Sequence, residues 1–275
     1  MGHLPVRAVG LRMGSVPAVD WLQALAIFGA GTAAGTINTL VGSGTLITFP
    51  TLLAFGYAPV TANISNNIGL VPGGVSGSFG YREELSGQRG RILRLGPMSL
   101  LGSVTGAALL LVLPAAAFTT IVPALLGISL VLVVIQPWMQ RTLQDRRDRS
   151  GTEPGRGHGV LVALGTYAAG VYGGYFGAAQ GILLIGLLGI LLPEPLQRLN
   201  ALKNVLSLIV NSVAAVTFTL LAFGRIDWAV VGLIAAGSLA GGFIGAGVGR
   251  RLPSIVLRGL IVVVGLVAIW QILSS

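Results

Sequence analysis

The sequence predicts an all-α polytopic membrane protein of two inverted-topology repeats, each with about five helical elements and a broken or re-entrant helix at its start. Three observations predict this class. Hydrophobic residues make up 53% of the 275-residue chain and charged residues only 9%, whereas a soluble domain has about 25% charged residues. Apolar segments recur in two sets of five. Basic residues gather in the loops between the segments, in a pattern that indicates their orientation.

The apolar segments come in order along the chain, and several reach the roughly 20 residues that a spanning helix takes. The first set is Trp21–Val41, Thr45–Phe55, Val60–Phe79, Leu95–Leu113 and Phe118–Pro137. The second set is Val160–Gly177, Ile182–Leu192, Leu199–Phe223, Ile226–Gly249 and Ile255–Leu273. Many of the 42 glycines recur four residues apart, as in Gly237, Gly241 and Gly245. This spacing is typical of closely packed membrane helices.

The second segment of each set has only 11 residues. That is about 16 Å of helix, which is too short to cross a hydrocarbon core of about 30 Å. Each short segment follows a glycine-bearing stretch, 41–44 in the first half and 177–181 in the second, where a helix can unwind. A shift of 137 residues aligns Gly44 with Gly181 without a gap. We therefore expect each short segment to be a half-helix at an equivalent place in its repeat.

Loop charges indicate how the two repeats are related. The loop after the third segment has four arginines between residues 82 and 94 in the first half, but only Arg225 with Asp227 in the second half. The next loop reverses the pattern, with no charge around Pro114 and three arginines between residues 250 and 258. Opposite orientations of the repeats place all the basic loops on the cytoplasmic face.

The pattern divides the chain into four parts. Residues 1–20 form an N-terminal arm, because prolines and arginines interrupt any signal-like apolar core. Residues 21–140 form the first transmembrane repeat, 141–158 a cytoplasmic linker with five arginines, and 159–275 the second transmembrane repeat. Positive-inside topology explains the net charge of +9. Nucleic acid is therefore not an expected partner.

Polar residues inside the apolar segments are the first candidates for function, because such side chains are costly at membrane depth. Two triplets with i, i+3, i+4 spacing occur at equivalent places: Asn63, Asn66 and Asn67, and then Asn200, Lys203 and Asn204. This spacing puts each triplet on one helix face. Interhelical hydrogen bonding, worth about 0.6 kcal/mol each in a membrane, is the alternative role. Two symmetric triplets favour a binding site.

Lys203 is the only lysine of the chain and lies four residues inside a long apolar helix. Two interpretations stay open. The side chain can snorkel from the helix end to the interface, or it can contact an anion or substrate. Its repeat equivalent, Asn66, belongs to a polar helix face, and this favours the second interpretation slightly.

The broken helices add a geometry that suits an anion. Their N-termini near Thr45 and Ile182 offer backbone N–H groups and positive dipole ends. Ser43 and Gln180 at the breaks, and Asn38 one turn earlier, add side-chain hydrogen-bonding groups. Together these groups predict a small oxyanion site near the bilayer midplane.

Other chemistries have little support in the sequence. Glu194 and Asp227 lie in loops or at helix ends, and both histidines, His3 and His158, lie outside the spans. Neither a carboxylate proton relay nor an intramembrane metal site is supported, and no cofactor is expected. The chain has no cysteine, which excludes a thiol nucleophile. Walker A, G-x-S-x-G and H-E-x-x-H motifs are absent, so we do not expect an enzyme.

Several stretches carry a family resemblance. Residues 35–50 (GTINTLVGSGTLITFP) and 62–67 (ANISNN), with Gly73-Gly74, resemble the first repeat of the TauE/SafE family of sulfite and organosulfur anion exporters. The part from Gly173 to Asn204, including NALKN at its end, is similar to the second repeat. The likeness covers nearly the whole chain from residue 21.

The resemblance implies a secondary transporter that moves small sulfur-containing anions, such as sulfite, sulfoacetate or related sulfonates, across the plasma (inner) membrane. We expect alternating access, with the anion and the lipid bilayer as partners; a coupling ion (proton or sodium) and a homo-oligomer stay open. The alternatives are an anion channel with the same lining and a membrane protein without transport activity. The expected substrate-binding residues are Ser43, Gly44, Thr45, Asn63, Asn66, Asn67, Gln180, Gly181, Asn200, Lys203 and Asn204.

Overall fold

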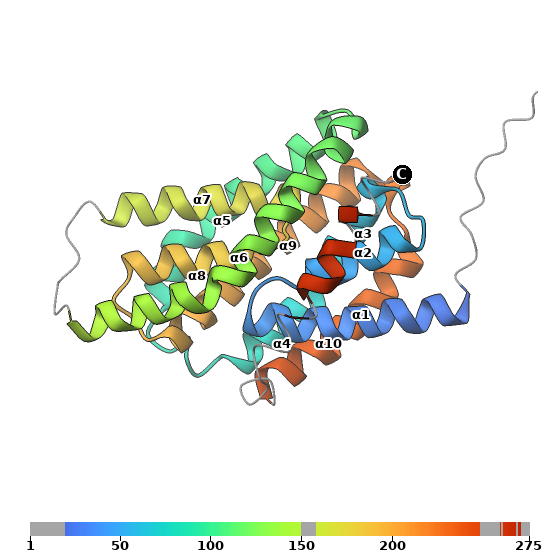
Figure 1. The fold of residues 1–275 in the computed structure, drawn as a ribbon. Coiled ribbons are helices and arrows are strands. Elements are labelled where there is room, and N and C mark those ends of the chain that lie inside the picture. The colour runs from blue at the N-terminus through green and yellow to red at the C-terminus, as the bar shows by residue number, and fades with distance from the viewer. Residues whose placement is uncertain (1–19, 150–157, 248–258, 260, 268, 271–275) are drawn as a thin grey trace, which may run out of the picture.

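The computed structural model describes residues 20–149, 158–247, 259, 261–267, 269 and 270. Every regular element within these residues is helical (Figure 1). The helices are α1 (Trp21–Leu40), α2 (Thr45–Ala54), α3 (Pro59–Gly69), α4 (Val71–Gly80), α5 (Arg89–Val112), α6 (Ala115–Arg149), α7 (His158–Tyr175), α8 (Gln180–Leu191), α9 (Leu196–Leu221), the 3₁₀ turn η1 (Phe223–Arg225) and α10 (Trp228–Gly247). Residues 1–19 of the predicted arm and the 250–258 loop lie outside the described residues.

The described helices include four that are long and apolar enough to cross a membrane. They are α5, the Ala115–Thr142 part of α6, α9 and α10. α2 and α8 are apolar but shorter. The predictions of an all-helical chain and of apolar spans are therefore confirmed.

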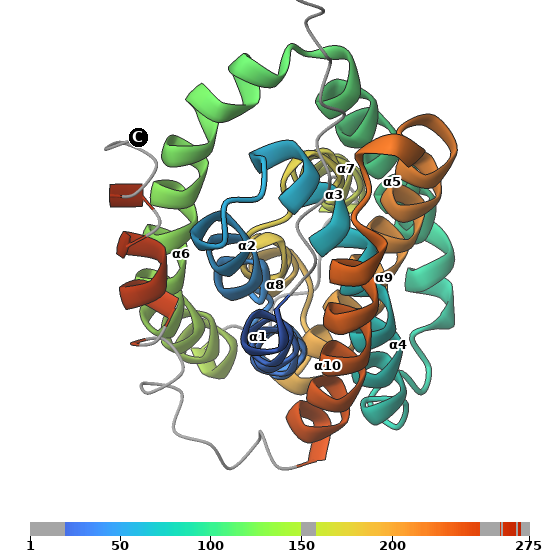
Figure 2. The ribbon, with the colours of Figure 1, turned by 90° about the vertical axis from the view of Figure 1, so that its right-hand side faces the viewer.

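The two short helices, α2 and α8, lie at the centre of the bundle, with the longer helices around them (Figure 2). Most of their residues are buried. α1 is separated from α2 at Gly42, which has φ +87°, and α7 is separated from α8 at Gly177 and Ala179, with φ +80° and +60°. These left-handed conformations end a helix, and glycine adopts them without strain. The predicted breaks are confirmed, with α8 beginning two residues earlier than expected.

Two helix pairs pack backbone against backbone through glycines. A Cβ atom on Gly35 of α1 would lie 2.3 Å from the carbonyl oxygen of Ser238 in α10. A Cβ atom on Gly106 of α5 would lie 2.0 Å from the carbonyl oxygen of Val171 in α7. No side chain fits at such distances, so the prediction that the glycine spacing serves close helix packing is confirmed.

The third segment of the first half differs from the prediction of one continuous apolar element. It is divided into α3 and α4 at Leu70. Pro72 has no N–H and cannot continue the helical hydrogen bonds, and a side chain of α10 enters the gap. The Ser238 hydroxyl donates to the Gly69 carbonyl (2.8 Å) and accepts from the Gly73 amide (3.2 Å). Insertion of a side chain between turns is a known cause of helix breaks.

Two stretches expected as loops are partly helical. α6 continues to Arg149, well into the predicted linker, whose residues 150–157 lie outside the described part. α5 begins at Arg89, so its first turns contain three of the four arginines assigned to the 82–94 loop. Arginine is a good helix former, and a charged first or last turn extends a membrane helix into the interface.

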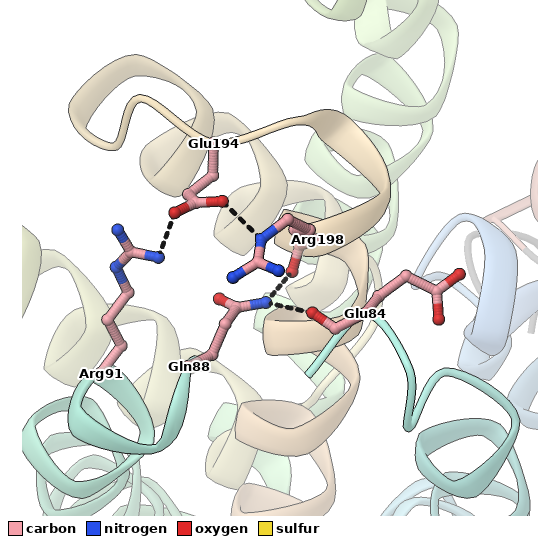
Figure 3. A network of polar contacts seen from close by, with 5 residues as sticks. All are labelled: Glu84, Gln88, Arg91, Glu194 and Arg198. Atoms are coloured by element: carbon pink, nitrogen blue, oxygen red, sulfur yellow. Dashed lines mark hydrogen bonds and ion pairs between the residues drawn. The ribbon is translucent and has the colours of Figure 1, made fainter. Parts of the chain in front are cut away.

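The inter-helix loops meet in pairs at the two ends of the bundle. At one end, loop 81–88 meets loop 192–195: Arg91, just after the first loop, pairs with Glu194 (2.5 Å), which also pairs with Arg198 (2.6 Å; Figure 3). Gln88 donates to the Arg198 carbonyl (2.8 Å). Partial burial raises the pKa of the Glu194 carboxyl, but the hydrogen bonds and charges of the two guanidiniums outweigh it and lower the pKa.

At the other end, loop 55–58 meets loop 222–227. The Asp227 amide donates to the Ser65 hydroxyl of α3 (2.9 Å), and its carboxylate accepts from the Val230 amide (3.0 Å), which caps α10. Partial burial raises the pKa of the Tyr57 hydroxyl, and the negative charge of Asp227 raises it further. The prediction that Glu194 and Asp227 are loop or helix-end residues is confirmed.

Candidate functional site

A small polar cavity lies where the two helix breaks meet. Its volume is about 30 Å³, which is room for about two water-sized groups. Residues of α1, α2, α4, α8 and α9 line it, and α4 contributes only glycines. Its polar lining residues, besides Asn38, are Thr39, Thr45, Gln180, Asn204, Ser207 and Asn211. Within the described part of the chain, this lining holds no charged side chain.

The two breaks touch each other through their backbones. The Gly181 amide at the start of α8 donates to the carbonyl of Gly42 (3.1 Å). A Cβ atom on Gly42 would lie 2.4 Å from the Gly181 Cα, so neither position accepts a larger residue. The two predicted half-helices therefore meet at one point inside the bundle.

Several backbone amides expected to face an anion have protein partners. The Gly44 amide, at the start of α2, donates to Oδ1 of Asn38 (2.7 Å). The Ile182 amide donates to the carbonyl of Ala179 (3.0 Å). Side chains, more than backbone amides, thus supply the donors of the cavity.

The triplet of the second half binds the C-terminal end of α1. Lys203 Nζ donates to the carbonyls of Asn38 (2.8 Å) and Thr39 (3.4 Å). Asn200 and Asn204 donate to the same Thr39 carbonyl at 3.0 and 3.3 Å. The Lys203 side chain is 1% exposed and lies inside the bundle, away from the surface where a snorkelling lysine would end. A cation here interacts favourably with the negative end of the helix dipole.

The triplet of the first half makes a related but different set of contacts. Asn63 donates to the carbonyl of Tyr175 (3.0 Å) at the end of α7, as Asn200 does at the end of α1. Asn66 accepts from the Thr48 hydroxyl and donates to that of Thr45 (3.3 Å), both in α2. Oδ1 of Asn67 is buried without a hydrogen-bond partner. The first triplet thus holds α7 and α2 in place.

The predicted site residues divide into two groups around the cavity. Thr45, Gln180, Gly181 and Asn204 line it. The others are buried but do not line it, and they are Ser43, Gly44, Asn63, Asn66, Asn67, Asn200 and Lys203. Lys203 packs against the lining residue Gly181, since a Cβ atom added to Gly181 would be 3.0 Å from Cδ of Lys203.

The sequence analysis missed two polar lining residues of α9, Ser207 and Asn211. The sequence does contain a signal for Ser207 and Asn211, because with Asn204 they have the i, i+3, i+7 spacing of residues on one helix face. Glycines of α4, among them Gly77, also line the cavity. No group of three or more histidine, aspartate or glutamate side chains that could hold a metal ion occurs among the described residues.

A polar cavity between two short broken helices, enclosed by apolar spans, defines the class of membrane transporters with discontinuous helices. The sequence profile of the family described as sulfite exporter TauE/SafE matches residues 27–272. The chain belongs to this family, and the prediction made from its motifs is confirmed.

Several relatives are similar to this chain over most of its length. The probable membrane transporter protein YfcA of Escherichia coli K12 is 27% identical over 234 residues, which is 82% of this chain and 79% of the relative. The probable membrane transporter protein ORF9 of a Sinorhizobium species is 25% identical over 90% of this chain and 92% of its own length. A probable membrane transporter protein of Haemophilus influenzae is 26% identical over 86% of this chain and 89% of its own. No solved structure matches significantly.

Proposed function

We propose that this chain is a secondary transporter that moves small sulfur-containing anions, such as sulfite or a small sulfonate, across the plasma membrane by alternating access. The observation that carries the proposal is the cavity at the contact of Gly42 with Gly181. Inverted-repeat carriers hold their substrate between discontinuous helices near the bilayer midplane. The N-termini of α2 and α8 contribute to the lining of the cavity, and these two helices lie at the centre of the bundle (Figure 2).

Electrostatics favour an anionic substrate. Lys203 is buried beside the cavity, and its hydrogen-bond partners there are neutral carbonyls of α1. A cation in a low-dielectric interior attracts an anion much more strongly than it would in water. Thr45, Gln180 and Asn204 supply side-chain hydrogen bonds at the wall. Lys203 acts in this proposal through its charge, and the lining residues make the contacts.

The arrangement of the loops supports two repeats of opposite orientation. In the first half, α3–α4 runs between loop 55–58 and loop 81–88, so these two loops lie at opposite ends of the bundle. In the second half, α9 runs between loop 192–195 and loop 222–227, so these two loops also lie at opposite ends. Tyr57 of loop 55–58 interacts electrostatically with Asp227 of loop 222–227, and Arg91, just after loop 81–88, pairs with Glu194 of loop 192–195. Loops 55–58 and 192–195, which are repeat equivalents, therefore lie at opposite ends, as inversion requires. The positive-inside rule assigns the arginine-rich end of loop 81–88 to the cytoplasm.

Flux measurements test the transport proposal. Purified protein in proteoliposomes should take up radiolabelled sulfite with saturable kinetics, and unlabelled sulfite on the opposite side should accelerate the flux. A large conductance that does not saturate would instead indicate an anion channel. The absence of any anion flux would indicate a membrane protein without transport activity.

Single cysteines test the topology, since the chain has none of its own. Ser86→Cys and Pro193→Cys should react with a membrane-impermeant maleimide from the cytoplasmic face, and Gly224→Cys only from the other face. These three positions are exposed. Labelling of positions 193 and 224 from the same side would contradict the inverted repeat.

A further inference from the structure

The helices around the cavity carry very little charge. Of the helices that line it, α1, α2, α4 and α8 contain no charged residue, and α9 contains two, Arg198 and Lys203. Arg198 lies near the start of α9 and pairs with Glu194. The buried Asp227 lies at one end of the bundle, where it caps α10. Within the described part of the chain, Lys203 is therefore the one buried cation, and no carboxylate pairs with it.

Lys203 lies close enough to act on an anion in the cavity. Its Nζ donates to the carbonyls of Asn38 and Thr39 at 2.8 and 3.4 Å, and its Cδ would be 3.0 Å from a Cβ atom on Gly181. These three contacted residues all line the cavity. The Coulomb attraction of the ammonium therefore reaches the cavity across a single layer of residues and needs no direct contact with the anion.

The helix ends at the two breaks add no net charge. Each break joins the C-terminus of one helix to the N-terminus of the next, α1 to α2 and α7 to α8. A helix N-terminus acts as about half a positive elementary charge, and a C-terminus as about half a negative one. The two ends at each break therefore cancel. The net charge of the site comes from Lys203, and it is a single positive charge.

The repeats show where a second charge would have been placed. Asn66 is the repeat equivalent of Lys203 and is 1% exposed. Its Nδ2 donates to the hydroxyl of Thr45 at 3.3 Å, and Thr45 lines the cavity. Because asparagine is uncharged, the first half contributes no charge from this position. The departure from symmetry at this pair of positions sets the charge of the whole site.

We propose that the cavity binds singly charged anions and excludes doubly charged ones. One negative charge forms a neutral pair with the Lys203 ammonium, whereas a second negative charge stays uncompensated in an apolar interior, which is costly. An unpaired charge is a common means of rejecting the wrong ligand. This inference depends on the proposed function and names the charge class of the substrate that the same site takes.

The proposal divides the substrates expected from the family resemblance. A simple sulfonate carries one negative charge and should bind, and sulfite should bind in its singly charged form. Sulfoacetate carries a carboxylate in addition to its sulfonate group. Its two charges should exclude it.

The test compares fluorosulfate with sulfate, two tetrahedral anions of similar size that differ by one charge. Neither anion changes its charge near neutral pH. Isothermal titration of the purified wild-type protein at neutral pH should show that fluorosulfate binds at least about a hundredfold more tightly, because an unpaired buried charge has a cost of this order.

Variants separate the effect of charge from a preference for weakly hydrated anions. Lys203→Met should lower fluorosulfate affinity at least about tenfold, whereas a preference set by hydration alone would leave it unchanged. Asn66→Lys adds a second positive charge and should raise the affinity for sulfate relative to fluorosulfate at least about tenfold. Asn66→Met is the matched control, since its side chain is long but uncharged, and it should keep the wild-type ratio.

The outcomes separate this inference from the proposed function. Sulfate binding as tight as fluorosulfate binding in the wild type overturns the charge selection and leaves sulfite transport intact. The same conclusion follows from sulfite transport without measurable fluorosulfate binding, from unchanged fluorosulfate affinity in folded Lys203→Met, or from an unchanged ratio in folded Asn66→Lys. If the wild type binds neither anion and transports no sulfite, the proposed function itself fails. The wild-type comparison does not depend on the folding of any variant.

Discussion

The two halves of the molecule have a similar arrangement of helices but use it for different purposes. Each glycine-packed helix pair (α1 with α10, α5 with α7) joins one helix from each half. In each half an asparagine binds the end of the helix before the other half's break: Asn63 at α7 and Asn200 at α1. The halves differ at the next position of the triplet. Asn66 binds α2, whereas Lys203 brings a buried charge to the end of α1.

The third helix shows a second difference. In the first half it is broken at Leu70 and held by Ser238, whereas α9 of the second half is continuous. Ser103, which follows a packing glycine of α5 as Ser238 follows one of α10, donates to the α9 carbonyl of Val210 at 2.7 Å. The shared features build the bundle, and the departures from symmetry gather around the cavity. The comparison therefore separates structural positions from candidate functional ones.

The largest expected effect comes from the contact between the breaks. Gly42→Ala places a Cβ atom 2.4 Å from the Gly181 backbone and should destabilise the protein by about 3 kcal/mol or more. Gly56→Ala is the control, because Gly56 has a similar φ of +82° but nothing within 4 Å of the added atom. It should cost only about 1 kcal/mol of backbone strain. Equal losses in thermal unfolding would show that the two breaks do not need to touch.

Lys203→Met removes the charge that distinguishes the second triplet and keeps much of the apolar stem. We expect a loss of about 2 kcal/mol in stability, because the carbonyls of Asn38 and Thr39 lose a charged donor. Sulfite affinity should fall at least tenfold. Arg198→Met removes the same charge from a partly exposed position on the same helix and should leave affinity unchanged. Titration calorimetry and thermal unfolding measure both effects; unchanged sulfite affinity in Lys203→Met would contradict the electrostatic role.

The break in α3–α4 predicts an intermediate effect. Ser238→Ala leaves the Gly73 amide without its acceptor and should cost about 1–2 kcal/mol, with faster hydrogen exchange at the start of α4. Ser103→Ala, the equivalent change, removes one bond to a helix that is continuous and should cost less. A larger loss in Ser103→Ala than in Ser238→Ala would show that the serine does not hold the break.

The smallest effect concerns the end of the bundle at Glu194. Because its folded pKa is lowered below the usual 4.5, the ionised carboxylate stabilises the fold above that value, and this contribution is lost as the pH falls through the folded pKa. Glu194→Gln should therefore lower stability by less than about 1 kcal/mol at pH 7, since the ion pairs are partly exposed. Thermal unfolding from pH 7 to pH 3 should show the two proteins converging at the acid end, and a constant difference would exclude an ionic role.

Much of this protein could be predicted from local sequence. The apolar segments, the two short helices and the glycine breaks follow from composition, length and the conformational freedom of glycine. Gln180 and Asn204 were identified because polar groups inside apolar helices are conspicuous. Ser207 and Asn211 were missed. They lie one and two turns after Asn204 on α9, where a polar side chain can face either the cavity or a neighbouring helix on the lipid side, and only the packing of the helices shows which.

By itself, the sequence determined that the chain is helical, lies in a membrane and is interrupted at two equivalent places, because these properties depend on hydropathy and backbone freedom within short windows. The tertiary structure alone decided which groups of the two triplets serve the fold and which face the cavity. Lys203 and Asn200 were predicted to contact a ligand, and the structure shows in addition that both bind the end of α1. The physical reason is that a buried donor takes the nearest acceptor, and that acceptor belongs to a residue more than 160 positions away in the chain.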